Sequence, residues 1–222
     1  IPSKNGYYYA LFWDQMPDLN FRNPEVTEEI FDATRFWLED VGVDGFRVDA
    51  ARHLVENGEV QINTPETHDW FKSWRTYYKA IAPDAMAIGE VWDSTANITK
   101  YLRGDELDLA FNFDLADSWV GGVSGGTGNV INFINKYEFE RTKGVIFATF
   151  LTNHDMNRVM NQLNGDIDKV KLAATLMLTF PGVPFIYYGE EIGMSGTKPD
   201  EDIRLPMQWS GDKNAGFTSG IP

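Results

Sequence analysis

The feature that most constrains the fold is an alternation of helix-forming segments with short apolar runs rich in branched and aromatic residues. Runs of five to seven such residues, too short for helices of their own, are typical of buried strands. Strands that alternate with helices predict a parallel sheet covered by helices, which is the α/β class. The predicted strands are 43–48, 85–91, 107–113, 145–151 and 183–188, and the predicted helices are 24–41, 64–81, 97–102, 129–137 and 167–180.

Two of these helices carry start signals. Asn23 precedes Pro24, and Thr64 precedes Pro65. A polar N-cap followed by proline at the first helical position is a typical helix start, because the side chain accepts from a free backbone N–H and proline lacks one. Gly42 predicts the end of the first helix. The glycine-rich stretch 121–128 is interpreted as a loop between a strand and the next helix.

Five strands are fewer than a closed barrel needs. A TIM (β/α)₈ barrel requires three more strand–helix units. An open doubly wound sheet is the competing fold, but it usually carries a glycine-rich phosphate fingerprint after its first strand, and this sequence has none. We therefore expect an incomplete TIM barrel over residues 25–222, comprising about strands four to eight. Residues 1–24 read as loop, and the chain is interpreted as an internal piece of a longer protein.

Three of the apolar runs end in a carboxylate: Asp49, Glu90 and Asp155. A carboxylate at the end of a buried strand is costly to desolvate, and active sites of barrels lie at the carboxyl ends of strands. Three acids delivered in this way indicate one site that handles a developing positive charge. Cleavage of a glycosidic bond has that requirement.

Each acid has a possible role and a structural alternative. Arg47 lies two residues before Asp49, on the same side of the strand, where it would keep a nucleophilic carboxylate ionised; a structural ion pair is the alternative. Trp92 would give Glu90 an apolar wall that raises its pKa, as a general acid needs, whereas a solvated strand-end glutamate is the alternative. Asp155 could stabilise an oxocarbenium-like charge, or could merely hydrogen-bond to His154.

Composition excludes several other classes of protein. The net charge is −14, which argues against nucleic-acid and anionic-membrane partners. There is no cysteine and there are only three histidines, so thiol catalysis and Cys-type zinc sites are excluded and a zinc hydrolase is disfavoured. The sequence has no G-x-S-x-G elbow, and this disfavours an esterase. The sequence is compatible with both an extracellular and a cytoplasmic location.

These motifs together resemble the α-amylase family, glycoside hydrolase family 13. The segment 45–53 is similar to the family's strand-four motif, 89–92 to strand five and 150–155 to strand seven. Residues 16–20 resemble the motif near the end of the inserted B domain, so 1–24 would be the end of that domain, and 184–194 resemble strand eight with its loop. The resemblance runs along essentially the whole chain. The family's strand-three segment and C-terminal β-sandwich are not among these residues.

The resemblance implies roles for individual residues. Asp49 would be the nucleophile, Glu90 the general acid/base and Asp155 the transition-state stabiliser. Arg47 would orient Asp49, His154 would bind sugar hydroxyls, and Arg52 and His53 would line the leaving-group side. Asp18 and the backbone carbonyl of His53 match positions that ligate calcium in many amylases, so a structural calcium is expected, with no organic cofactor.

The implied activity is that of a retaining hydrolase cleaving α-1,4-glucosidic bonds in α-glucans or maltooligosaccharides. We expect it of the whole protein rather than of these 222 residues alone. The small Ala50, where related oligo-1,6-glucosidases often carry valine, favours the α-1,4 linkage. The alternatives are an oligo-1,6-glucosidase, an isomerase of the trehalulose type or a neopullulanase of the same family, and a non-catalytic sugar-binding barrel, which retention of all three acids disfavours.

Overall fold

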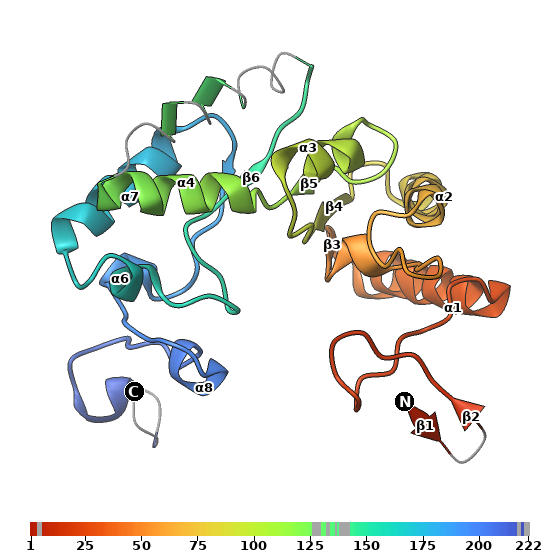
Figure 1. The fold of residues 1–222 in the computed structure, drawn as a ribbon, viewed down its shortest axis with the longest axis horizontal. Helices are drawn as coiled ribbons and strands as arrows, with labels where there is room; N and C mark the ends of the chain where they lie inside the picture. The colour runs from red at the N-terminus through yellow and green to blue at the C-terminus, as the bar shows by residue number, and fades with distance from the viewer. Residues whose placement is uncertain are drawn as a thin grey trace.

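The computed structural model describes residues 1–3, 6–125, 130–131, 134–135, 137, 143–216 and 219. Figure 1 shows an open arch in which both termini lie on the same side. The chain starts with a small antiparallel hairpin of β1 (Pro2–Ser3) and β2 (Gly6–Tyr7), within the stretch that was interpreted as loop. The predicted alternation of helices and strands follows.

The strands are parallel and follow one another in chain order, as predicted. Strand β3 (Gly45–Val48) pairs with β4 (Met86–Gly89), which pairs with β5 (Leu109–Ala110). A parallel bridge between Phe111 and Ala148 leads to β6 (Ala148–Thr149), which pairs with β7 (Val183–Pro184). The strands are shorter than the apolar runs, because only part of each run is paired in the ladder.

The two predicted helix starts are confirmed. Helix α1 (Pro24–Arg35) begins after Asn23, whose side chain accepts from the N–H of Glu25, and continues as a π-helical turn, η1 (Phe36–Val41), to the left-handed Gly42. Helix α2 (Pro65–Ile81) begins after Thr64, whose hydroxyl accepts from the N–H of Thr67. Both caps satisfy a free backbone donor locally, which is why sequence reasoning located them.

The interpretation of 121–128 as a loop was wrong at its start. Helix α4 (Phe113–Ser124) includes Gly121 and Gly122. It begins directly after β5, where the Asn112 side chain accepts from the N–H of Leu115 at 3.1 Å, so the strand predicted to reach Phe113 ends earlier. The segment 129–137, predicted to be helical, falls partly outside the described residues.

The remaining elements are short except for one. Helix α7 (Ile167–Thr179) begins at Asp166, whose carboxylate accepts from two backbone N–H groups. The others are η2 (Ala51–His53), α3 (Thr95–Ile98), η3 (Thr99–Leu102), α6 (Val159–Gln162), η4 (Glu190–Ile192), α8 (Asp200–Ile203) and η5 (Lys213–Gly216).

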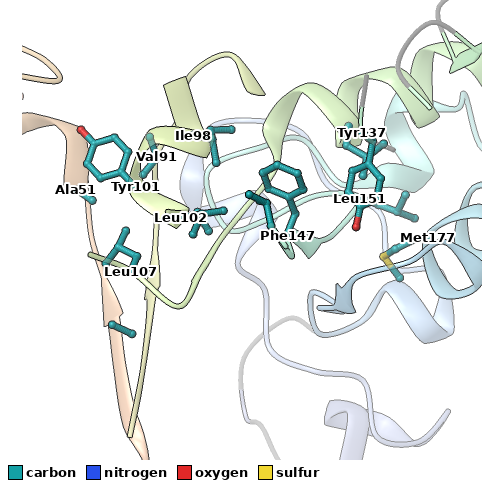
Figure 2. Close-up of a cluster of buried hydrophobic side chains, with 14 of the residues drawn as sticks. Ala51, Val91, Ile98, Tyr101, Leu102, Leu107, Tyr137, Phe147, Leu151 and Met177 are labelled. Atoms are coloured by element: carbon teal, nitrogen blue, oxygen red, sulfur yellow. The ribbon is translucent and has the colours of Figure 1, made fainter. Parts of the chain in front are cut away.

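The core lies between the sheet and its covering helices. Figure 2 shows part of it, where buried side chains from the β3–β5 half and from the β6–β7 half form one continuous cluster. Gly45 is required at the start of β3, because a Cβ there would lie 2.0 Å from the carbonyl oxygen of Met86. This close approach holds the first two strands of the sheet together.

Both outer strands have an unpaired edge, as an incomplete barrel predicts. Among the described residues, β3 pairs only with β4 and β7 only with β6. Large apolar side chains are exposed beside these edges, including Phe36, Trp37 and Val41 on the β3 side and Phe185 and Ile186 on the β7 side. Exposed apolar edges of this kind favour association or aggregation.

Candidate active site

The three strand-end acids lie around one pocket of about 500 Å³. Asp49 follows β3, Glu90 follows β4, and Asp155 lies beyond β6. They meet because the carboxyl ends of parallel strands share one edge of the sheet. The other residues that line the pocket are Phe12, Met16, Ala50, Arg52, His53, Trp92 and Asp200.

Arg47 joins the first two acids. Its Nη1 contacts Asp49 Oδ1, and its Nη2 lies 3.0 Å from Glu90 Oε2. The same Oε2 accepts from the backbone N–H of Ala50 at 3.1 Å. One guanidinium therefore fixes both carboxylates side by side, as the alternation along β3 predicts for Arg47 and Asp49.

The two acids differ in their access to solvent. The Asp49 side chain is 75% exposed, whereas that of Glu90 is 10% exposed. Burial raises the pKa of Glu90, and the nearby Asp49 carboxylate raises it further, against the lowering effects of Ala50 N–H and Arg47. An accessible carboxylate beside a shielded carboxyl of raised pKa is the arrangement that separates a nucleophile from an acid.

The third acid is held through both of its carboxylate oxygens. His154 Nε2 lies 3.3 Å from Asp155 Oδ2, and Arg204 Nη2 lies 2.8 Å from Asp155 Oδ1. His154 itself does not line the pocket, so it reaches the site through Asp155. Arg204 was missed by sequence reasoning, because it stands 49 residues from Asp155 and belongs to no acid-bearing strand end.

Arg52 and His53 line the pocket from η2. Arg52 Nη1 lies 3.3 Å from Asp93 Oδ2, and its Nε contacts His53 Nε2 at 3.0 Å. Burial and the charge of Arg52 lower the pKa of His53. His53 therefore favours its neutral form, which can accept as well as donate a hydrogen bond.

Aromatic and apolar side chains complete the pocket. Trp92 stacks on Phe113 at 4.5 Å between ring centroids and remains 42% exposed. Phe12 packs edge-on against His53 at 5.2 Å. A fixed ring with one face free beside carboxylates is suited to contact with the apolar face of a sugar ring.

Comparison with known proteins identifies the wider group. Residues 2–222 match the family described as "Alpha amylase, catalytic domain". The chain belongs to the α-amylase family. Its sheet is therefore part of the family's TIM barrel, as predicted, and the sequence resemblance stated above is confirmed.

Three members of the α-amylase family show how similar this chain is to known proteins. Alpha-amylase 3 of Dictyoglomus thermophilum is 46% identical over 96% of this chain and 42% of its own length. Neopullulanase 2 of Thermoactinomyces vulgaris is 32% identical over 90% of this chain and 32% of its own. The crystal structure of the α-amylase from H. orenii superposes with a TM-score of 0.85 and 38% identity, covering 95% of this chain and 43% of that one. The chain thus spans less than half the length of these relatives.

The calcium expected from the family resemblance stays a prediction. Asp18 is exposed, and its Oδ2 accepts from the N–H of Leu11 at 2.8 Å. Across the part of the chain that the structure describes, no three acidic or histidine side chains gather where a metal ion could bind. These residues alone do not form a calcium shell. None of the described helices has the length and apolarity to cross a membrane.

Proposed function

We propose that the whole protein is a retaining glycosidase that cleaves α-1,4-glucosidic bonds. The observation that carries the proposal is the Arg47 bridge, which holds Asp49 and Glu90 together at one wall of the pocket. Two carboxyl groups that contact one guanidinium favour retention, because an inverting enzyme needs roughly 6.5–9.5 Å between them to admit a water molecule.

In the first step, an oxygen of Asp49 attacks the anomeric carbon of the sugar. The bond to the leaving oxygen breaks, and the Glu90 carboxyl gives that oxygen its proton. The sugar is then held as an ester of Asp49. Arg47 orients the Asp49 carboxylate for attack, and the raised pKa of Glu90 keeps its proton available.

In the second step, the Glu90 carboxylate takes a proton from water, and the oxygen of that water attacks the anomeric carbon. The ester bond breaks, and both acids return to their starting forms. Loss of the negative charge on Asp49 in the ester removes one cause of the raised pKa of Glu90. The same group is thereby a better acid in the first step and a carboxylate base in the second.

Asp155 lines the same pocket as the other two acids and would bind sugar hydroxyls while positive charge develops at the anomeric carbon. Trp92, Phe12 and Met16 would contact the sugar faces. Arg52 and His53 would bind the leaving portion of an α-glucan chain.

The preference for the α-1,4 linkage rests on Ala50, a small residue in the floor of the pocket beside Asp49 and Glu90. A methyl-scale difference in a pocket gives about 1–3 kcal/mol of discrimination, so the preference should be partial. An enzyme of the neopullulanase or oligo-1,6-glucosidase type is the second candidate, since the relatives include a neopullulanase.

The test compares kcat/KM for maltotriose and isomaltotriose with the whole protein. Higher kcat/KM for maltotriose is expected, and equal or faster cleavage of isomaltotriose would favour the second candidate. The anomeric form of the first product, followed by NMR, tests retention. Asp49→Asn and Glu90→Gln should each abolish turnover, whereas Glu191→Gln, a change to an exposed glutamate, should not.

A further inference from the structure

Arg204 is a second arginine that, like Arg47, bridges two acids of the pocket. Its Nη2 lies 2.8 Å from Asp155 Oδ1 and 2.9 Å from Asp200 Oδ2. Its Nε donates to the carbonyl oxygen of His154 at 2.9 Å. Asp155 and Asp200 both line the pocket. One guanidinium thus holds two pocket acids and the backbone of the segment that carries one of them.

The backbone on both sides of Arg204 is fixed by a pair of tyrosines. The Tyr187 hydroxyl donates to the carbonyl of Ile203 at 3.1 Å, and the Tyr188 hydroxyl donates to the carbonyl of Leu205 at 2.7 Å. The Ile203 side chain is fully buried. Because residues 203 and 205 are both held, the Arg204 side chain projects from a backbone that has little freedom to shift.

The segment before Arg204 is also tied to the residues that follow Asp155. The backbone N–H of Lys198 donates to Asn157 Oδ1 at 2.7 Å. The N–H of Arg158 donates to the carbonyl of Gly196 at 3.0 Å. The segments 153–162 and 194–205 therefore form one hydrogen-bonded unit, which lines the pocket through Asp155 and Asp200.

The charges explain why an arginine is needed at this place. Asp155 and Asp200 both contact the same nitrogen, so the two carboxylates would repel each other if the guanidinium were absent. The Lys198 hydrogen bond, together with the charge of Arg204, lowers the pKa of Asp200. Since His154 contacts Asp155 Oδ2 and Arg204 contacts Oδ1, both oxygens of Asp155 are held and the plane of its carboxylate is set.

We propose that Arg204 is a positioning residue for Asp155, and that the Tyr187–Tyr188 pair fixes Arg204 for that purpose. The inference rests on the proposed function, in which Asp155 stabilises the transition state. Arg204 acts through the orientation of Asp155 and not through contact with the reacting atoms. A misplacement of about 1 Å in a group of this kind can reduce the rate roughly 10²-fold.

The experiment is a double-mutant cycle in the whole protein, with 4-nitrophenyl α-maltotrioside as the substrate because its activated leaving group keeps slow variants measurable. Arg204→Gln should lower kcat by roughly 10- to 100-fold and raise KM much less. Arg204→Lys should recover part of the loss, since lysine restores the charge but not the fork that reaches three acceptors. In an Asp155→Asn background, Arg204→Gln should change kcat by less than about twofold, because the group it positions is already altered.

The controls separate positioning from a general loss of structure. Tyr188→Phe removes only one fixing hydroxyl, and it should lower kcat in the same direction by a smaller factor. Arg35→Gln, a change to an exposed arginine on α1, should leave kcat and KM unchanged. If Arg204→Gln lowers kcat equally in both backgrounds, or leaves it unchanged in the wild type, the positioning role is wrong. If Asp155→Asn alone retains wild-type kcat, the role of Asp155 in the proposed function fails instead.

Discussion

Glu190 is a half-buried acid outside the pocket, and its ionisation should make the stability of the protein depend on pH. Its Oε1 accepts a hydrogen bond from the Thr152 hydroxyl, three residues before Asp155. Its Oε2 is buried and, among the described residues, has no hydrogen-bond partner. Burial raises the pKa of Glu190 to about 7, although the Thr152 hydrogen bond and the charge of Arg158 oppose the shift.

The sign of the effect follows from the two pKa values. The ordinary value of 4.5 applies to the unfolded chain, so below it both states are protonated and the folded state keeps its full stability. Between 4.5 and about 7 the folded state holds the proton while the unfolded state releases it, so stability falls as the pH rises. At about 1.4 kcal/mol for each pH unit between the two values, the total loss is roughly 3 kcal/mol, and it levels off above neutral pH.

The perturbation is Glu190→Gln, which keeps the shape of the side chain and its hydrogen bond with Thr152 but cannot ionise. Relative to the wild type, the variant should gain roughly 3 kcal/mol of unfolding free energy between pH 4.5 and pH 8.5. Urea unfolding of the whole protein at these two pH values, followed by tryptophan fluorescence, measures this difference.

Glu191→Gln is the matched control, because Glu191 is the neighbouring residue and is exposed. Its effect on the unfolding free energy should be small and equal at the two pH values. If the difference between Glu190→Gln and the wild type is the same at pH 4.5 and pH 8.5 within about 0.5 kcal/mol, the reasoning from burial is refuted.

Three further changes test the pocket. Arg47→Met should lower kcat on the order of 10²–10³-fold, because it releases Asp49 and Glu90 together. Steady-state kinetics measures this loss, and a loss smaller than tenfold would contradict the role of the Arg47 bridge. Asp49→Asn should lower the pKa of Glu90, since the Asp49 carboxylate helps to raise it, and an NMR titration that finds the pKa unchanged would contradict this. Ala50→Val should shift kcat/KM towards isomaltotriose, but at a cost of roughly 1–2 kcal/mol in unfolding free energy, because Ala50 has a left-handed backbone with φ of 43°. Thermal denaturation of Ala50→Val, Ala50→Gly and the wild type measures that cost. The glycine variant should be at least as stable as the wild type.

The strain at Ala50 illustrates what local sequence cannot supply. The sequence shows that Ala50 is a small residue after an acid and that valine would be larger. It does not show the left-handed backbone at this position. The backbone turns sharply at this point because β3 ends and η2 begins, with the Ala50 N–H directed at Glu90. That turn depends on a neighbouring strand, so no pattern within 45–53 specifies it.

The sequence by itself determined the features that depend on near neighbours in the chain. The caps at Asn23 and Thr64 and the pairing of Arg47 with Asp49 follow from residues within a few positions of each other. The parallel order of the strands follows from the alternation of helices and strands along the chain. The common site of the three acids was predicted from their positions at strand ends, and the family resemblance added a role for each. Helix α4 was not predicted, because the apolar run 107–113 was assigned to a strand and the glycines at 121–128 to a loop. In the structure, Asn112 caps the start of this helix, and the helix packs against α7.

The tertiary structure alone decided the contacts that join distant segments. Arg204 reaches Asp155 across 49 residues, and Thr152 reaches Glu190 across 38. The raised pKa values of Glu90 and Glu190 depend on which atoms exclude water from them, and those atoms come from several strands and loops. Periodicity and capping report interactions along the chain, whereas burial and long-range ion pairs exist only once the strands have come together.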